Sequence, residues 1–271
     1  MADIAALIVH GMGTQEPDFW QPLANDLDDR LVRMGHAQGS VAWQSGFWAD
    51  LLTPHEEDLW RRSQAAGPLD FKSLRQFVVN ALGDAVAYRR PPGSQDNVYD
   101  EIHARVHASL RTLWQTISSD LPLVVIAHSM GSVIMSDYIW NAQTQNRYAK
   151  GEGPFESMKT LSGFITFGSN IPLFSLAFPD PRAITFPPPE LPPALAEVAE
   201  WNNYYDEDDV LGWPLKELSA SYGAAVKADI EINVGTWYSS WSPASHTQYW
   251  GDEDFQVPVA EQLARVIKAV R

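Results

Sequence analysis

Short apolar runs rich in β-branched residues alternate along the chain with longer segments whose apolar residues recur at helical spacing. In residues 97–120 and 257–270 the apolar positions repeat every three or four residues, which predicts amphipathic helices. The alternation predicts an α/β fold with a mostly parallel central sheet and helices on both faces. The runs with the length of strands are 4–9, 40–48, 121–127, 161–168, 198–205 and 229–235.

Two segments interrupt this alternation. Residues 50–90 predict extra helices, which end where Pro91 and Pro92 follow each other, because proline cannot continue a helix. Residues 178–193 hold so many prolines that we expect an irregular surface excursion there. No repeat or linker divides the chain, whose 271 residues suit one α/β domain. We therefore predict a single domain over residues 1–271, with residues 50–95 as a candidate helical cap.

The charge and the cysteine count exclude several classes of function. With 34 acidic and 19 basic residues, the formal net charge is −15, so the protein's field repels nucleic acid and anionic membrane surfaces. The chain has no cysteine, which removes thiol nucleophiles, disulfides and zinc–cysteine sites. A nucleophile in this protein must therefore be an oxygen or a nitrogen.

The first residues and the hydropathy bear on the compartment. The apolar start carries Asp3 and lacks the basic segment that opens a secretory signal. No stretch approaches the roughly 20 apolar residues that span a bilayer. We expect a cytoplasmic protein without stable membrane insertion; the oligomeric state stays open.

A serine stands where the third predicted strand passes into a helix, in the stretch "VVIAHSMGSV" at 124–133. Small residues two positions before and after it, Ala127 and Gly131, suit a sharp strand-to-helix turn. The stretch resembles the "(G/A)HS(L/M)G" nucleophile elbow of lipase- and esterase-like α/β-hydrolases, with Ala127 in place of the commoner glycine. The resemblance implies that Ser129 is a nucleophile with His128 near the substrate. The alternative is a plain strand–helix joint.

The stretch "LIVHGMGTQ" at 7–15 supplies a second feature of the same superfamily. It resembles the HG motif, whose loop gives one backbone N–H to the oxyanion hole, while the residue after the nucleophile gives the other. We assign the N–H from the loop to Met12 and the N–H after the nucleophile to Met130. The choice between Met12 and its neighbour Gly11 stays open, and Gly11 is also a candidate substrate contact. A dinucleotide fingerprint fits less well, because Glu16 stands where the third glycine belongs and would repel a pyrophosphate.

His246 is the candidate base among seven histidines. It follows the last predicted strand and precedes the C-terminal helix, and "SHTQYW" resembles the "H..YW" context of lipase-like relatives; the alternative is a surface histidine. His103 and His107 have the i, i+4 spacing that can chelate a metal. "HARVH" lacks the glutamate of a zinc-protease motif, so we expect a partly exposed helix face instead, and no metal or organic cofactor.

The candidate acid lies in the stretch "DEDDVL" at 206–211, after the fifth predicted strand. The chain order of serine, acid and histidine is the order that α/β-hydrolases use. Asp209 precedes Val210 and Leu211 as the acid does in relatives, and Asp206 at the strand end is the alternative. At least two of the four acidic residues must belong to a solvated turn.

These features together predict acyl transfer to water on a small-molecule ester. Trp237 and Trp241 precede His246 and are candidates for lining an acyl pocket, although large aromatic residues usually serve the core. A thioesterase or an amidase would use the same residues. A protein of another class, a non-catalytic binding protein on a hydrolase scaffold, is the remaining alternative.

Overall fold

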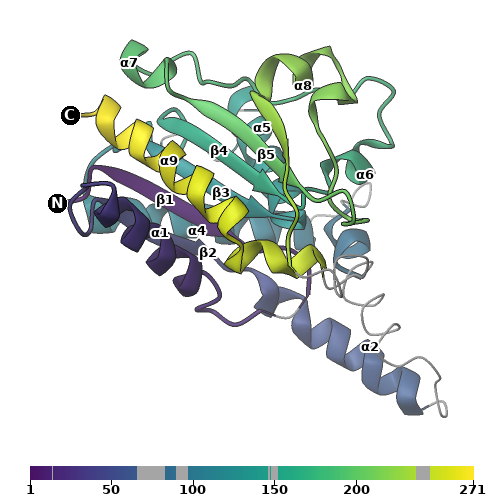
Figure 1. Cartoon of the computed structure of the whole chain (residues 1–271). Coiled ribbons are helices and arrows are strands. Elements are labelled where there is room, and N and C mark those ends of the chain that lie inside the picture. Colours follow the sequence, from purple (N-terminus) through teal and green to yellow (C-terminus); the bar gives the residue numbers. More distant parts are fainter. Residues whose placement is uncertain (14, 66–82, 90–96, 146, 148–151, 236–244) are drawn as a thin grey trace.

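The computed structural model describes residues 1–13, 15–65, 83–89, 97–145, 147, 152–235 and 245–271. Its strands are β1 (Ile4–Val9), β2 (Val41–Gly46), β3 (Leu123–His128), β4 (Leu161–Phe167), β5 (Glu200–Tyr205) and β6 (Ala228–Glu231) (Figure 1). Its α-helices are α1 (Gln21–Arg33), α2 (Thr53–Ala65), α4 (Val98–Ile117), α5 (Met130–Thr144), α6 (Ile171–Ser175), α7 (Pro193–Ala196), α8 (Ala220–Ala225) and α9 (Glu253–Ala269). The 3₁₀ turns are η1 (Ala49–Leu51), η2 (Lys216–Leu218) and η3 (Ser245–Gly251).

The six strands form one sheet in the order β2-β1-β3-β4-β5-β6, and every neighbouring pair is parallel. Each predicted run overlaps one strand, so the predicted α/β class is confirmed. Because all described strands run the same way, their carboxyl ends meet at one edge of the sheet. Loops that leave this edge are where α/β sheets bind ligands.

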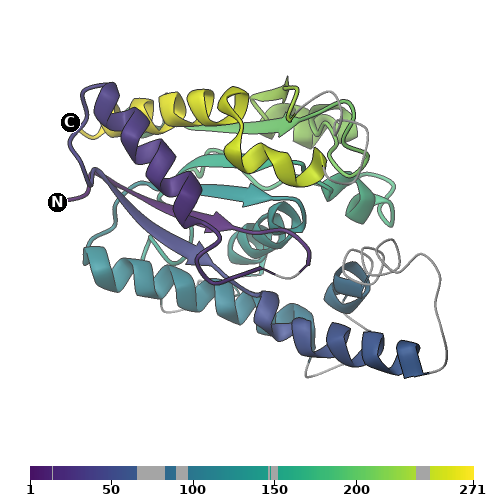
Figure 2. The ribbon, with the colours of Figure 1, turned by 60° about the horizontal axis from the view of Figure 1, so that its bottom comes forward.

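Helices cover both faces of the sheet. α1 and α9 lie on one face, and α4 and α5 lie on the other (Figures 1 and 2). Successive residues of β1 point to opposite faces, so Ala6 and Ile8 join the cluster under α1 and α9, while Leu7 and Val9 join the cluster under α4 and α5. Burial on both faces explains why β1 and β3 are continuous apolar runs and not alternating ones.

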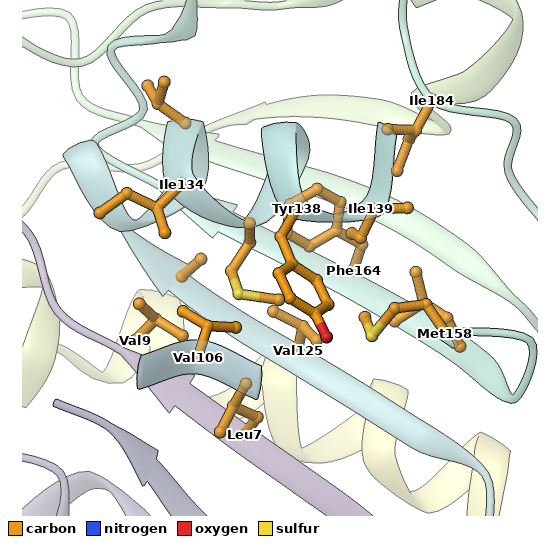
Figure 3. Packing of buried hydrophobic residues seen from close by; sticks show 14 of the residues in the cluster. Leu7, Val9, Val106, Val125, Ile134, Tyr138, Ile139, Met158, Phe164 and Ile184 are labelled. Carbon is orange, nitrogen blue, oxygen red and sulfur yellow. The ribbon is translucent and has the colours of Figure 1, made fainter. Parts of the chain in front are cut away.

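The cluster under α4 and α5 supports the start of α5. Figure 3 shows Val106 of α4 and Ile134 of α5 packed with Leu7, Val9 and Val125 of the sheet. All five side chains are almost completely buried. This packing holds the junction between β3 and α5, where Ser129 lies, against the end of β1.

The two segments that interrupt the predicted alternation, 50–90 and 178–193, lie outside the regular layers, and the first is described only in part. α2 projects beyond the sheet (Figures 1 and 2), and residues 83–88 are helical where the chain returns to the body. Residues 66–82 and 90–96 lie outside the described residues, so a cap over 50–95 stays a prediction. Residues 178–192 form neither helix nor strand, as their prolines predict. No helix in the described part of the chain has the length and apolar character needed to cross a membrane.

Candidate active site

Ser129 occupies a strained turn between β3 and α5. Its φ of 51° and ψ of −124° are unusual for a residue with a side chain. The Ser129 N–H donates to the Phe167 carbonyl at 3.0 Å, and the Ser132 N–H donates to the Ser129 carbonyl at 2.9 Å. The turn therefore has the sharp strand-to-helix shape of a nucleophile elbow, placed on an all-parallel α/β sheet.

Two glycines let the loop after β1 approach this turn. A Cβ on Gly131 would lie 2.5 Å from the His10 carbonyl oxygen and 2.9 Å from that of Val9. A Cβ on Gly11 would lie 2.6 Å from the Ser129 Cβ and 3.1 Å from its Oγ. Real Cβ atoms do not approach backbone or a neighbouring Cβ so closely, so any larger residue at either position would push the loop away from Ser129.

Ser129, His246 and Asp209 are brought together from three distant parts of the chain. The His246 Nε2 lies 2.6 Å from the Ser129 Oγ, and its Nδ1 lies 2.8 Å from Oδ2 and 3.1 Å from Oδ1 of Asp209. All three residues are buried. Because a carboxylate only accepts hydrogen bonds, the proton of a neutral His246 sits on Nδ1, and Nε2 accepts from the serine hydroxyl.

The environment of Asp209 keeps it ionised. Burial by itself would raise the pKa of Asp209. The hydrogen bond from His246 and the charge of His246 lower the pKa, and so do the hydrogen bonds from the Leu211 N–H at 3.0 Å and the Tyr249 O–H at 2.9 Å. Together these interactions hold the pKa of Asp209 below its usual range. Burial and the Asp209 charge raise the pKa of Tyr249, which therefore remains a neutral donor. The "H..YW" context marks Tyr249, but only the fold reveals this contact.

Asp206, the alternative acid, has a different set of partners. Its Oδ2 accepts from the Val234 N–H and its Oδ1 from the Asp208 N–H, each at 2.8 Å. Asp206 is buried like Asp209, while Glu207 is exposed and Asp208 is half-buried. Asp206 therefore braces the loops after β5 and β6, and Asp209 faces the imidazole.

His10 fixes the loop that carries Met12. Its Nδ1 lies 2.7 Å from the Gly11 carbonyl, so this nitrogen is the donor, and its Nε2 accepts from the Trp48 N–H at 3.0 Å. Burial lowers the pKa of His10 to about 4, so the ring is neutral. The C=O and N–H of a trans peptide point in opposite directions. The Met12 N–H of the Gly11–Met12 peptide is therefore directed away from the His10 ring.

Met130 and His128 flank the serine. Met130 is the first residue of α5, where backbone N–H groups lack partners within the helix. The His128 Nε2–H donates to the His246 carbonyl at 2.7 Å, and burial, followed by the charge of His246, lowers the pKa of His128 to about 3. His128 thus holds the backbone of His246. Its contact with substrate stays a prediction, and Trp237 and Trp241 lie outside the described residues.

His103 differs from the partly exposed helix face expected for it, whereas His107 is half-buried and fits that expectation. His103 is fully buried, with its Nε2 2.9 Å from the Tyr88 hydroxyl, and His107 Nδ1 lies 2.8 Å from the Tyr138 hydroxyl. Burial, followed by the charge of Arg147, lowers the pKa of His103 to about 3. Each ring is engaged by an aromatic hydroxyl from another helix, which spacing along one helix could not reveal. Among the residues described, no three potential metal ligands gather.

A separate surface cavity of about 420 Å³ lies near the far end of α5. Its lining includes Gln143, Lys159, Thr185 and Glu190, and none of the residues that meet at Ser129. Gln143 lies about 20 Å along the helix from Met130 at 1.5 Å per residue. The cavity therefore belongs to another part of the surface.

Acid should unfold this protein through its buried neutral histidines. His10, His103 and His128 titrate near 6.5 when unfolded but near 3 to 4 when folded, so below pH 6.5 the unfolded state binds more protons and stability falls. Each of these three histidines should lower the free energy of unfolding by about 2 kcal/mol between pH 7 and pH 5. Burial raises the pKa of Asp137 to about 6, although the hydrogen bond from Tyr88 opposes this rise. The folded state therefore gains a proton on this carboxyl as the pH falls to 5, which stabilises it by about 1 kcal/mol.

Urea unfolding at pH 7 and pH 5 measures this loss of folding stability, which should be about 5 kcal/mol in all. The His103→Asn variant should lose about 2 kcal/mol less over the same interval, because asparagine does not titrate. His55→Asn, at an exposed position of α2, is the matched control and should keep the wild-type pH dependence. The assignment fails if His103→Asn retains the full wild-type loss.

Comparison with solved structures gives a distant likeness, while comparison of the sequence gives none. No family model and no curated protein matches the sequence. Among solved structures, the chain is similar to a hormone-sensitive lipase from a metagenome library, with a TM-score of 0.48 and 12% sequence identity. The match covers 100% of this chain and 79% of the lipase chain. The fold class rests instead on the parallel sheet and the turn at Ser129.

Proposed function

We propose that the protein is a serine hydrolase that cleaves carboxylic esters through an acyl-serine intermediate. The observation that carries this proposal is the buried series of hydrogen bonds from Asp209 through His246 to Ser129, with distances of 2.8 Å and 2.6 Å. Nucleophilic catalysis by serine needs this arrangement of an alcohol, a base and an orienting acid.

In the proposed reaction, His246 Nε2 takes the hydroxyl proton as the Ser129 Oγ attacks the ester carbonyl. Asp209 stabilises the imidazolium that forms. The tetrahedral oxyanion accepts hydrogen bonds from the N–H groups of Met130 and Met12, each of which contributes roughly 3 kcal/mol. His246 then protonates the leaving alcohol, and water, deprotonated by the same nitrogen, releases the acid from Ser129.

Related reactions and a binding role remain the alternatives. Thioesters and amides differ from esters only in the leaving group, so a thioesterase or an amidase would use the same residues. A binding protein without turnover has no need of a strained Ser129 whose hydroxyl is hydrogen-bonded to an imidazole. Strain of this kind costs on the order of 1–3 kcal/mol and persists where function requires it. This cost favours a catalyst.

A fluorophosphonate probe tests the proposal, because it phosphonylates only activated serines. Wild-type protein should gain one label, which peptide mapping should locate at Ser129, and Ser129→Ala should gain none. A panel of p-nitrophenyl esters, thioesters and amides then separates the substrate classes. Folded wild-type protein that leaves Ser129 unlabelled would favour the binding role.

A further inference from the structure

The chain that returns after α2 contacts the loop that carries Met12. In the helical residues 83–88, Asp84 is buried, with 2% of its surface exposed. Its Oδ2 accepts a hydrogen bond from the Gly13 N–H at 2.9 Å, across 71 positions of sequence. A carboxylate acceptor makes this bond stronger than one between neutral groups.

The peptides on both sides of Met12 are therefore held by side chains. His10 fixes the carbonyl of the Gly11–Met12 peptide, and Asp84 fixes the N–H of the Met12–Gly13 peptide. Gly13 has a φ of 88°, a conformation that glycine adopts readily but most residues do not. Without its anchor this glycine could rotate, and the Met12 N–H would turn with it.

The same helical turn is also anchored to the body, so Asp84 has a defined position. The Tyr88 O–H donates to the Asp137 Oδ2 of α5 at 2.9 Å, and the His103 Nε2 of α4 lies 2.9 Å from the Tyr88 oxygen. Tyr88 is 2% exposed and its ring also contacts the ring of Tyr99, with centroids 4.9 Å apart. Residues 84 and 88 thus connect the helices α4 and α5 to the loop after β1.

We propose that Asp84 is a positioning residue for the oxyanion hole: through Gly13 it holds the Met12 N–H in the direction of the developing oxyanion. The inference rests on the proposed serine hydrolase function. In this proposal Asp84 acts on the oxyanion through the loop, and its negative charge would itself oppose an oxyanion. An amide at this position, which keeps an acceptor oxygen and removes the charge, should therefore preserve catalysis.

The test measures kcat and KM on a p-nitrophenyl ester, the rate of fluorophosphonate labelling, and Tm. Asp84→Ala should lower both kcat and the labelling rate about 10- to 100-fold, somewhat less than direct loss of one oxyanion donor. KM should change less than about threefold, because uniform substrate binding is unaffected. Asp84→Asn should stay within about threefold of wild type in kcat.

Asp58→Ala is the matched control. Asp58 belongs to α2 of the same insertion and pairs with Arg61 and Arg62, so its removal changes the charge equally without touching the loop after β1. This variant should keep the wild-type kcat. If Asp84→Ala does not fold, Asp84→Glu replaces it: the added methylene displaces the carboxylate from Gly13, and kcat should fall about tenfold below that of Asp84→Asn.

Three outcomes would overturn the inference. In the first, folded Asp84→Ala keeps kcat and the labelling rate within twofold of wild type. In the second, Asp84→Asn loses as much kcat as Asp84→Ala, which indicates a structural role of the charge. In the third, Asp84→Glu equals Asp84→Asn. Failure to label wild-type Ser129 would instead overturn the proposed function and this inference with it, so the two failures are distinguishable.

Discussion

Replacement of His246 by alanine is expected to lower kcat on a p-nitrophenyl ester by about a million-fold, as loss of the base does in serine hydrolases. The Ser129 hydroxyl donates to the His246 Nε2 at 2.6 Å, and no other group in the proposed mechanism can take its proton. A neutral serine hydroxyl is a weak nucleophile at pH 7. Fluorophosphonate labelling of Ser129 should fall in parallel with kcat, although the serine itself is unchanged.

The control for this variant is His55→Ala. His55 is exposed on α2, so the substitution removes an imidazole without disturbing the residues around Ser129. Its kcat and labelling rate should match those of wild type. If His246→Ala kept more than about a tenth of the wild-type kcat while folded, another group would have to be the base.

The second large effect is expected for Asp209→Asn, which should lower kcat by about ten thousand-fold. Three donors surround Asp209: the His246 Nδ1–H, the Leu211 N–H and the Tyr249 O–H. An amide turns one of its N–H groups toward one of these donors. If that donor is His246, the ring proton moves to Nε2, where it faces Ser129 and cannot accept the hydroxyl proton.

Asp206→Asn is the matched control for Asp209→Asn, because both carboxylates are buried and three positions apart. The two oxygens of Asp206 accept from Val234 and Asp208, so the amide loses one acceptor. This change should cost about 1–3 kcal/mol of folding stability and lower Tm, while kcat stays within about threefold. The opposite pattern, with Asp209→Asn active and Asp206→Asn inactive, would make Asp206 the acid.

The sheet could be predicted because its signal is local. Strands buried on both faces must be largely apolar, which marks β1 and β3 in the sequence. β5 and β6 carry polar residues, and their aromatic and β-branched residues mark them instead. α1 was not predicted, although Leu23, Ala24, Leu27 and Leu31 form its buried stripe. Their spacing is helical, so the periodicity of the sequence carries the signal for this helix as clearly as for α4 and α9. The short helices α6 and α8 are too brief for a periodic pattern to register.

The residues around Ser129 could be predicted to different degrees. The turn itself is a local feature, since Ala127 and Gly131 must be small wherever β3 passes so sharply into α5. The predictions of His246 as the base and Asp209 as the acid depended on the resemblance to lipase-like proteins and on the order of these residues along the chain. The choice between Asp206 and Asp209 depends on how one turn directs two carboxylates. Asp206 meets the N–H of Val234, which lies 28 positions away.

Sequence alone determined the strands, the turn at Ser129 and the set of candidate side chains, because each depends on neighbours within a few positions. Only the tertiary structure decided which groups meet. His103 is buried and forms a hydrogen bond with the Tyr88 hydroxyl. His128 donates a hydrogen bond to the carbonyl of His246, and Asp84 accepts one from the Gly13 N–H. Hydrogen bonds and desolvation act over a few ångströms of space, and folding brings to that distance residues that are far apart along the chain.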